Sequence, residues 1–199
     1  MPNGYSGKIL RVDLSSRKSW VEEQDDIFYR TYVGGRGIIA HYLLHEVPPH
    51  SDPLGPKNIL VFAPSILTGT TIPGTARNSV GAKSPLTGGY GEGEGGGEWG
   101  VKLRWAGYDG LVVTGCSPEP VYLWIDNDTV AIKDASSLWG MEPYECREAI
   151  RSENADSRAE AAMIGPGGEG LISFACIALQ RSHSKKYLPE TTSGTLDLR

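Results

Sequence analysis

The residues of this sequence best suited to chemistry lie between positions 77 and 100, where glycines, acids and cations are concentrated. The segment from Gly91 to Gly100 reads GEGEGGGEWG. Glycine has no Cβ, so the backbone N–H groups of Gly95–Gly97 could approach a polar ligand closely. Arg77 and Lys83 supply cations that could face the same ligand, although either one alone is more simply explained as surface charge. Together these residues favour a surface for an anionic ligand that carries a bulky ring system.

Two other interpretations of the glycine run are open at this point. A flexible linker is usually rich in serine, whereas this run is followed by Trp99 and Trp105, which are costly to leave in a mobile tether. A dinucleotide-binding G-x-G-x-x-G motif is also spelled from Gly91 to Gly96. That motif requires a buried strand directly before it, and the preceding KSPLTGGY does not read as one. The packed glycine surface is therefore favoured over both.

The cysteines and histidines do not have the spacing of a metal site. Cys116, Cys146 and Cys176 form no CxxC pair and have no histidine at ligand spacing, so we expect small buried thiols. His41 and His45 lie one helical turn apart, which could suit a metal but more often marks the solvent side of an amphipathic helix. We expect no catalytic residue and no metal ligand in this chain.

Hydropathy patterns predict both helices and strands around these residues. The alternating runs of GKILRVDLSSRKSWVEE predict a β-hairpin, and RGIIAHYLLHEV predicts a helix because its apolar residues fall on one face. We expect further strands at NILVFAP, RNSVGAK, GLVVTG, PVYLWID and TVAIKD, and helices at DDIFYRTYVGG, EWGVKLRWAGYDG and MEPYECREAIRSEN. AAMIGPGGEGLISFACIAL should form a strand, a glycine turn and a second strand. This order is typical of the α+β class rather than of a parallel nucleotide-binding sheet.

Composition excludes several kinds of partner. The net charge of −5 leaves no broad basic field for nucleic acid or an anionic membrane. No apolar run reaches the length of a membrane span, and MPNGYSGKILRVDL lacks the apolar core of a signal peptide. We therefore expect a cytoplasmic protein with no nucleic-acid and no membrane partner. The sequence becomes polar beyond Leu179, so we expect one compact domain over residues 1–179 and a loose, divergent tail over 180–199.

Several segments, in order, resemble the amino-terminal domain of the aldehyde:ferredoxin oxidoreductases, a family of tungsten- or molybdenum-pterin enzymes. The most specific of them are DPLGPKN, KSPLTGG, AGYDG and DASSLWG, and the resemblance covers roughly residues 4 to 178. It implies a domain of two β-sheets related by approximate two-fold symmetry, with short helices. It also implies that this domain is the base on which a tungsten- or molybdenum-bis-pterin cofactor sits.

The resemblance implies cofactor-binding residues as well. The arginine that matches Arg77 helps to hold the cofactor's phosphate groups, which suits a guanidinium. The segment that approaches one pterin matches Glu94, Gly95, Gly96 and Gly97. Family members commonly have Asn-Ser-Gly-Gly there, and because a carboxylate cannot donate a hydrogen bond, Glu94 would instead accept from the pterin's amino groups. A second departure follows FACIA, where RSHSKKYLPETTSGTLDLR replaces an Arg-Gly-Gly-rich segment of the family and Arg181 could be its remnant.

We therefore interpret the chain as the cofactor-seating domain, truncated or encoded separately, of an enzyme that oxidises an aldehyde to a carboxylic acid. In the family, electrons leave for ferredoxin through a 4Fe–4S cluster whose ligands belong to later domains, so this chain alone should not catalyse. The alternative is a non-catalytic pterin-binding or assembly module, or a degenerate fragment. In either case we expect exposed apolar and glycine-lined surface, and association with itself or with a separate chain that carries the cluster and catalytic domains.

Overall fold

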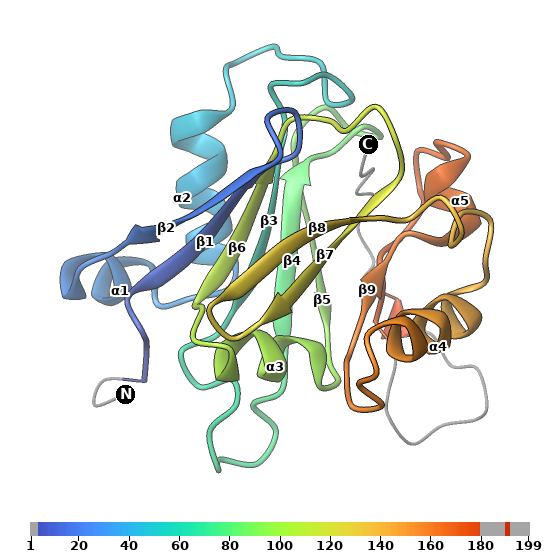
Figure 1. Cartoon of the computed structure of the whole chain (residues 1–199). Coiled ribbons are helices and arrows are strands. Elements are labelled where there is room, and N and C mark those ends of the chain that lie inside the picture. The colour runs from blue at the N-terminus through green and yellow to red at the C-terminus, as the bar shows by residue number, and fades with distance from the viewer. Residues whose placement is uncertain (1–3, 180–189, 192–199) are drawn as a thin grey trace.

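The computed structural model describes residues 4–179 and 190–191, and its centre is a six-stranded mixed sheet (Figure 1). The strand order is β2-β1-β6-β3-β4-β5. The pair β1 and β6 runs parallel, and the other neighbouring pairs run antiparallel. The strands are β1 (Lys8–Asp13), β2 (Lys18–Glu23), β3 (Ile59–Pro64), β4 (Asn78–Lys83), β5 (Tyr90–Gly95) and β6 (Gly110–Thr114). Strands β3 and β6 are buried on both faces because their runs ILVFAP and GLVVT are almost wholly apolar.

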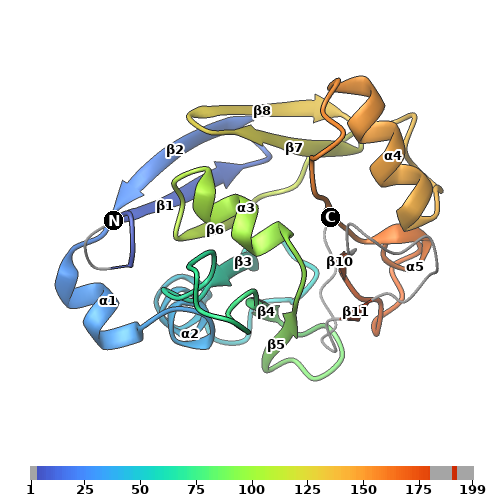
Figure 2. The ribbon, with the colours of Figure 1, turned by 90° about the horizontal axis from the view of Figure 1, so that it is seen from below.

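Each face of this sheet is covered by a different set of elements, as Figure 2 shows. Helices α1 and α2 lie on one face, and helix α3 lies with a separate two-stranded sheet on the other. These elements are α1 (Asp26–Tyr32), α2 (Arg36–Glu46), α3 (Trp99–Trp105), β7 (Val121–Asp126) and β8 (Thr129–Asp134). Strand β1 shows the division, because Ile9 packs in the cluster with α2 and Leu10 packs in the cluster with α3.

The C-terminal part of the described chain forms a small unit beside β5 and the two-stranded sheet of β7 and β8 (Figure 2). It consists of α4 (Pro143–Glu153), β9 (Ala162–Met163), α5 (Gly165–Glu169), β10 (Ala178–Leu179) and β11 (Glu190–Thr191). The three short strands pair in the order β11-β10-β9. Ile177 and Leu179 belong to the same buried cluster as the α3 face of the large sheet. This unit therefore shares a core with the sheet.

The predicted α+β class is confirmed, and each predicted helix and strand has a counterpart. The strands of the described residues hydrogen-bond in three sheets, where the resemblance implies two. The predicted glycine turn at residues 165–169 is wrong, because this segment forms helix α5. Strand β5 is an element that the sequence patterns did not predict.

Two expectations concern the ends of the chain and membranes. Apart from β11, the predicted loose tail at residues 180–199 lies outside the described residues, and the domain boundary at 179 stays a prediction. Among the described helices, none is both long enough and apolar enough to cross a bilayer.

Candidate functional site

The pairing of β4 with β5 brings Arg77 to the glycine run. In this antiparallel pair Asn78 lies opposite Gly95, so the preceding Arg77 and the following Gly96 meet at the same end of the two strands. The Nη1 atom of Arg77 lies 3.8 Å from Oε2 of Glu94. The predicted site residues therefore gather at one edge of the sheet. Whether they bind a cofactor stays a prediction.

The backbone of Arg77 is fixed by a buried threonine in the loop before β4. Thr68 is 2% exposed, and its Oγ1 donates to the carbonyl oxygen of Arg77 at 2.7 Å. The same Oγ1 accepts from the backbone N–H of Ser65 at 3.0 Å. The side chain of Arg77 itself is 69% exposed. The loop therefore holds the main chain of Arg77 in place and leaves its guanidinium in solvent.

The acids and glycines of β5 lie on opposite faces of the strand. Gly93 pairs with Val80, a core residue on the α3 face, so the glycines of β5 lie on that face. Glu92 and Glu94 alternate with them and lie on the other face, beside the start of α2. The sequence GEGEG thus has the period of two that is typical of a strand, although neither residue type is apolar.

Helix α2 begins at this edge and contributes a second arginine. Gly34 and Gly35 both have positive φ, at 127° and 51°, which turns the chain sharply into the helix. The side chain of Arg36 then reaches both acids of β5, with Nε 3.0 Å from Glu92 Oε2 and Nη2 3.1 Å from Glu94 Oε1. The charge of Glu92, and then that of Glu94, raises the pKa of Arg36 above its usual value.

Exposure divides this four-charge cluster into two layers. The side chains of Arg36 and Arg77 are 66% and 69% exposed, whereas those of Glu92 and Glu94 are 10% and 35% exposed. The second carboxylate oxygen of Glu92, Oε1, is buried without a hydrogen-bond partner. Two guanidinium groups therefore face solvent above two carboxylates. Arg36 is the functional candidate that the sequence patterns missed, and the signals for it were the Gly-Gly pair before the helix and the alternation in β5.

Lys83 does not belong to this site. It ends β4, whereas Arg77 precedes that strand, so the strand rise separates the two by roughly 20 Å. Its Nζ donates to the carbonyl oxygen of Ser51 at 2.7 Å. The expectation that both cations face one ligand is therefore wrong for Lys83.

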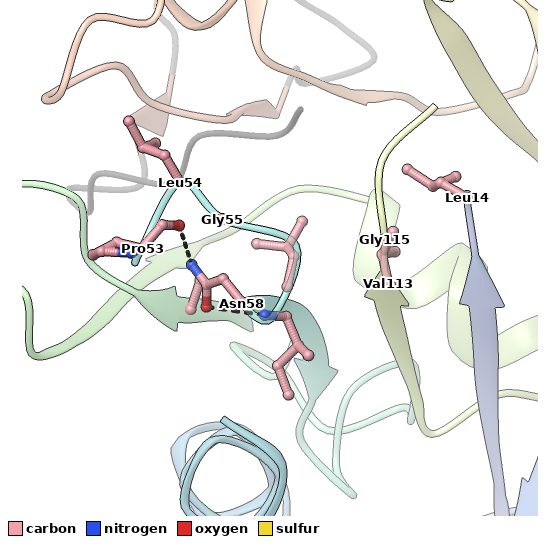
Figure 3. Close-up of a pocket in the computed structure, with 10 residues that line it drawn as sticks. Leu14, Pro53, Leu54, Gly55, Asn58, Val113 and Gly115 are labelled. Atoms are coloured by element: carbon pink, nitrogen blue, oxygen red, sulfur yellow. Dashed lines mark hydrogen bonds between the residues drawn. The ribbon is translucent and has the colours of Figure 1, made fainter. Parts of the chain in front are cut away.

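Two hollows of the described chain lie away from the site, at the Lys83 end of β4. One hollow, of about 50 Å³, is lined by Leu14, Leu54, Asn58 and neighbouring residues at the other end of the sheet (Figure 3). The Asn58 side chain donates to Pro53 O and Lys83 O at 2.7 and 2.9 Å and accepts from two backbone N–H groups. A drug-sized ligand needs about 300–1,000 Å³. This hollow is too small for one, and its amide is already satisfied.

The described cysteines and His41 differ in burial. Cys116 is exposed, which corrects the expectation of buried thiols, and Cys146 and Cys176 are partly buried. His41 packs against the ring of Tyr32 at 4.6 Å rather than facing solvent, and burial lowers its pKa. Among the described residues, no three His, Cys, Asp or Glu side chains gather as a metal site requires.

The two tryptophans near the glycine run differ in burial. Trp99 packs on Phe62 with ring centroids 4.8 Å apart and joins the core on the α3 face. Trp105 is 64% exposed, and its Nε1 donates to the carbonyl oxygen of Gly69 at 3.1 Å. Of these two tryptophans, only Trp99 packs against the core, as expected if the segment is ordered rather than a mobile tether.

Comparison with known proteins identifies relatives that match most of this chain. The model of the aldehyde ferredoxin oxidoreductase N-terminal domain matches residues 9–188. The tungsten-containing aldehyde ferredoxin oxidoreductases of Thermococcus kodakarensis and Pyrococcus furiosus are 43% and 41% identical over 174 residues, or 87% of this chain and 29% of each relative. An aliphatic sulfonate oxidoreductase, WOR-like subunit, of P. furiosus is 39% identical and is matched over 92% of this chain and 31% of its own length.

A solved structure gives the same fold. A chain of the active site complex BamBC of benzoyl coenzyme A reductase, in complex with 1,5-dienoyl-CoA, has a TM-score of 0.90 and 36% identity over 97% of this chain. This chain covers 29% of that chain. It thus spans a little under a third of the length of the relatives it matches.

Proposed function

The chain belongs to the aldehyde ferredoxin oxidoreductase family, whose amino-terminal domain it matches, and from this premise we propose that it seats the cofactor of a tungsten or molybdenum oxidoreductase. The observation that carries the proposal is the pairing of Asn78 with Gly95. It sets the exposed Arg77 beside Gly96 and Gly97, which are partly exposed, whereas Gly95 itself is buried. An arginine fork suits phosphate, and glycine backbone suits a flat ring.

The residues at this edge would each bind a different part of a phosphate-bearing pterin. Arg77 would hold phosphate oxygens, and the backbone of Gly95, Gly96 and Gly97 would lie along the ring system. Glu94 would accept hydrogen bonds from the pterin's amino groups, since a carboxylate only accepts. When bound, the metal–pterin group supplies the two-electron oxidation chemistry. The contribution of this chain is binding and orientation.

The whole protein would oxidise an aldehyde to a carboxylic acid, with water as the source of the added oxygen and with release of two protons and two electrons. The two electrons released would leave through a 4Fe–4S cluster to ferredoxin, and we assign the cluster and the acid–base groups to the two-thirds of the relatives that this chain does not span. The metal that the relatives' names give is tungsten. Further domains, or a separate chain carrying them, would cover the open edge.

The relatives offer an alternative to an aldehyde as the substrate. A relative named for aliphatic sulfonate is 39% identical to this chain, against 41% for an aldehyde enzyme of the same organism. The amino-terminal domain therefore resembles relatives with different named substrates almost equally. We infer that this domain supplies the common cofactor seat and that the substrate is selected elsewhere in the protein.

The test is cofactor content. The chain is purified from cells that make the metal–pterin cofactor, and its pterin is released, oxidised and measured by fluorescence, together with tungsten and molybdenum. We expect pterin in the unmodified chain and a loss of about tenfold or more in Arg77→Gln, because a charge-assisted contact of about 1.5–3 kcal/mol is removed. Arg30→Gln changes an exposed arginine on α1 and is the matched control.

Equal pterin content in Arg77→Gln and Arg30→Gln would contradict the proposed role of Arg77. If neither the unmodified chain nor Arg30→Gln contains pterin, the proposal that this domain binds the cofactor is contradicted, and a degenerate fragment is favoured. We also expect no aldehyde-dependent reduction of a viologen dye by this chain alone. Such activity would refute the assignment of electron transfer to other domains.

A further inference from the structure

The geometry points to a two-arginine anion site, formed by Arg36 and Arg77, in which the carboxylate of Glu94 holds the place of a phosphate-class ligand. The inference rests on the proposed function, because it adds a second cation and an internal competitor to the same edge. Glu94 places one oxygen on each arginine: Oε1 is 3.1 Å from Arg36 Nη2, and Oε2 is 3.8 Å from Arg77 Nη1. The carboxylate thus bridges two guanidinium groups as an anionic ligand would.

The side chain of Arg36 and the main chain of Arg77 are held independently of Glu94. Arg36 keeps a second ion pair through its Nε with Glu92 Oε2 at 3.0 Å, and the Glu92 side chain is only 10% exposed. The main chain of Arg77 is anchored by Thr68, as described above. When Glu94 moves aside, the Arg36 guanidinium therefore stays at the edge, and its Nη side faces the place that the carboxylate leaves. The exposed guanidinium of Arg77 starts from a fixed main chain and can turn to the same place.

Glu94 is held weakly enough to be exchanged. Both arginine side chains are about two-thirds exposed, at 66% and 69%, and exposed ion pairs contribute only about 0–1 kcal/mol. The contact with Arg77, at 3.8 Å, is longer than a hydrogen bond. A phosphate brings more charge and three acceptor oxygens to the same two forks. It would therefore replace the carboxylate.

The start of α2 adds to the attraction for an anion. Helix α2 has 11 residues, and its first turn carries no acidic side chain. Its N-cap residue is Gly35, which has no side chain that could cap the helix. The partial positive charge of a helix N-terminus favours an anion there. The ligand class that fits is a phosphate or diphosphate ester, since two convergent forks offer more donors than one carboxylate accepts.

The test is a calorimetric titration of the full chain with inorganic pyrophosphate. We expect Glu94→Gln to bind about three- to fivefold more tightly than the unmodified chain, because an exposed competing ion pair is removed. Glu98→Gln is the matched control, since it removes an exposed acid near the same run at the α3 N-cap, where it caps no backbone group. Arg36→Gln and Arg77→Gln should each weaken binding by about tenfold, and Arg30→Gln should not.

Three results would overturn the inference. They are no gain for Glu94→Gln beyond that of Glu98→Gln, no loss for Arg36→Gln beyond that of Arg30→Gln, and no pyrophosphate binding by any variant. A titration with a phosphate-free pterin separates the inference from the proposed function. If pterin binds and Arg36 and Glu94 have no effect on pyrophosphate, the seat stands and the anion exchange fails. If pyrophosphate behaves as expected and no pterin binds, the anion site stands and the pterin seat fails.

Discussion

Replacing Asp109 by asparagine should remove much of this domain's stability margin, because Asp109 balances a buried cation and anchors the N-terminal strand. Asp109 is 2% exposed and forms an ion pair with Arg104, which is 3% exposed. Its carboxylate also accepts from the backbone N–H of Ser6 at 2.9 Å and of Gly7 at 2.7 Å. The AGYDG motif is thereby tied to the GYSG motif about a hundred residues earlier.

The magnitude follows from the charge left behind rather than from the hydrogen bonds. The amide oxygen of the substituted side chain would still accept from the backbone, so most of those bonds have a substitute. The guanidinium of Arg104 would lose its buried counter-ion, and breaking a buried pair from one side costs about 3–5 kcal/mol. Domains of this size have about 5–15 kcal/mol in total. We therefore expect Asp109→Asn to lose a fifth or more of the free energy of unfolding.

The assay is urea unfolding followed by tryptophan fluorescence, with the free energy obtained by linear extrapolation. Asp128→Asn, in the exposed turn between β7 and β8, makes the same chemical change and should stay within about 0.5 kcal/mol of the unmodified chain. A loss below about 1 kcal/mol for Asp109→Asn would refute the reasoning. It would mean that Arg104 reaches solvent, or another acceptor, at little cost.

Two further predictions concern the elements around the candidate site. Gly37→Ala should destabilise the chain by about 1–3 kcal/mol in the same assay, because a Cβ there would lie 2.1 Å from the carbonyl oxygen of Tyr32. Gly167→Ala, in helix α5, has room at 3.7 Å from Ala175 and should stabilise by about 0.5–1 kcal/mol; equal effects at both positions would contradict the prediction. Burial lowers the pKa of His41 below its usual 6.5, so the unfolded chain takes up the proton first as the pH falls. The urea midpoint should therefore hold above about pH 6.5 and fall below it, and His41→Gln should reduce this fall, whereas an unchanged slope would count against it.

Much of the fold could be predicted from hydropathy alone. The apolar runs of β3 and β6 read as buried strands, and the periodicity of α2 placed its apolar face correctly. Strand β5 could not be found in this way, because glycine and glutamate both disfavour strands. Its conformation comes from pairing with β4 along six residues. Local propensity was overridden there by a tertiary contact.

The candidate site was predictable only in part. The meeting of Arg77 with Gly96 follows from the register of β4 and β5, and the resemblance to a family suggested it before that register was known. Arg36 was missed, because the Gly-Gly pair before the helix and the alternation in β5 do not show that it lies beside Glu92 and Glu94, more than fifty residues away. Only the packing of α2 on the sheet brings them together. Sequence patterns report faces of single elements and contain little about which element lies over which.

Glycine within the sheet explains why Arg36 reaches this edge at all. Gly81 pairs with Glu92, and a Cβ on Gly81 would come within 2.3 Å of Cγ2 of Ile39 in α2. The missing side chain therefore lets the first turns of α2 lie close over β4 and β5, with Arg36 above both acids. Attraction between the charges could not impose this arrangement, because exposed ion pairs contribute only about 0–1 kcal/mol. The arginine is positioned by packing, so exchanging Glu94 for a phosphate would need no movement of the helix.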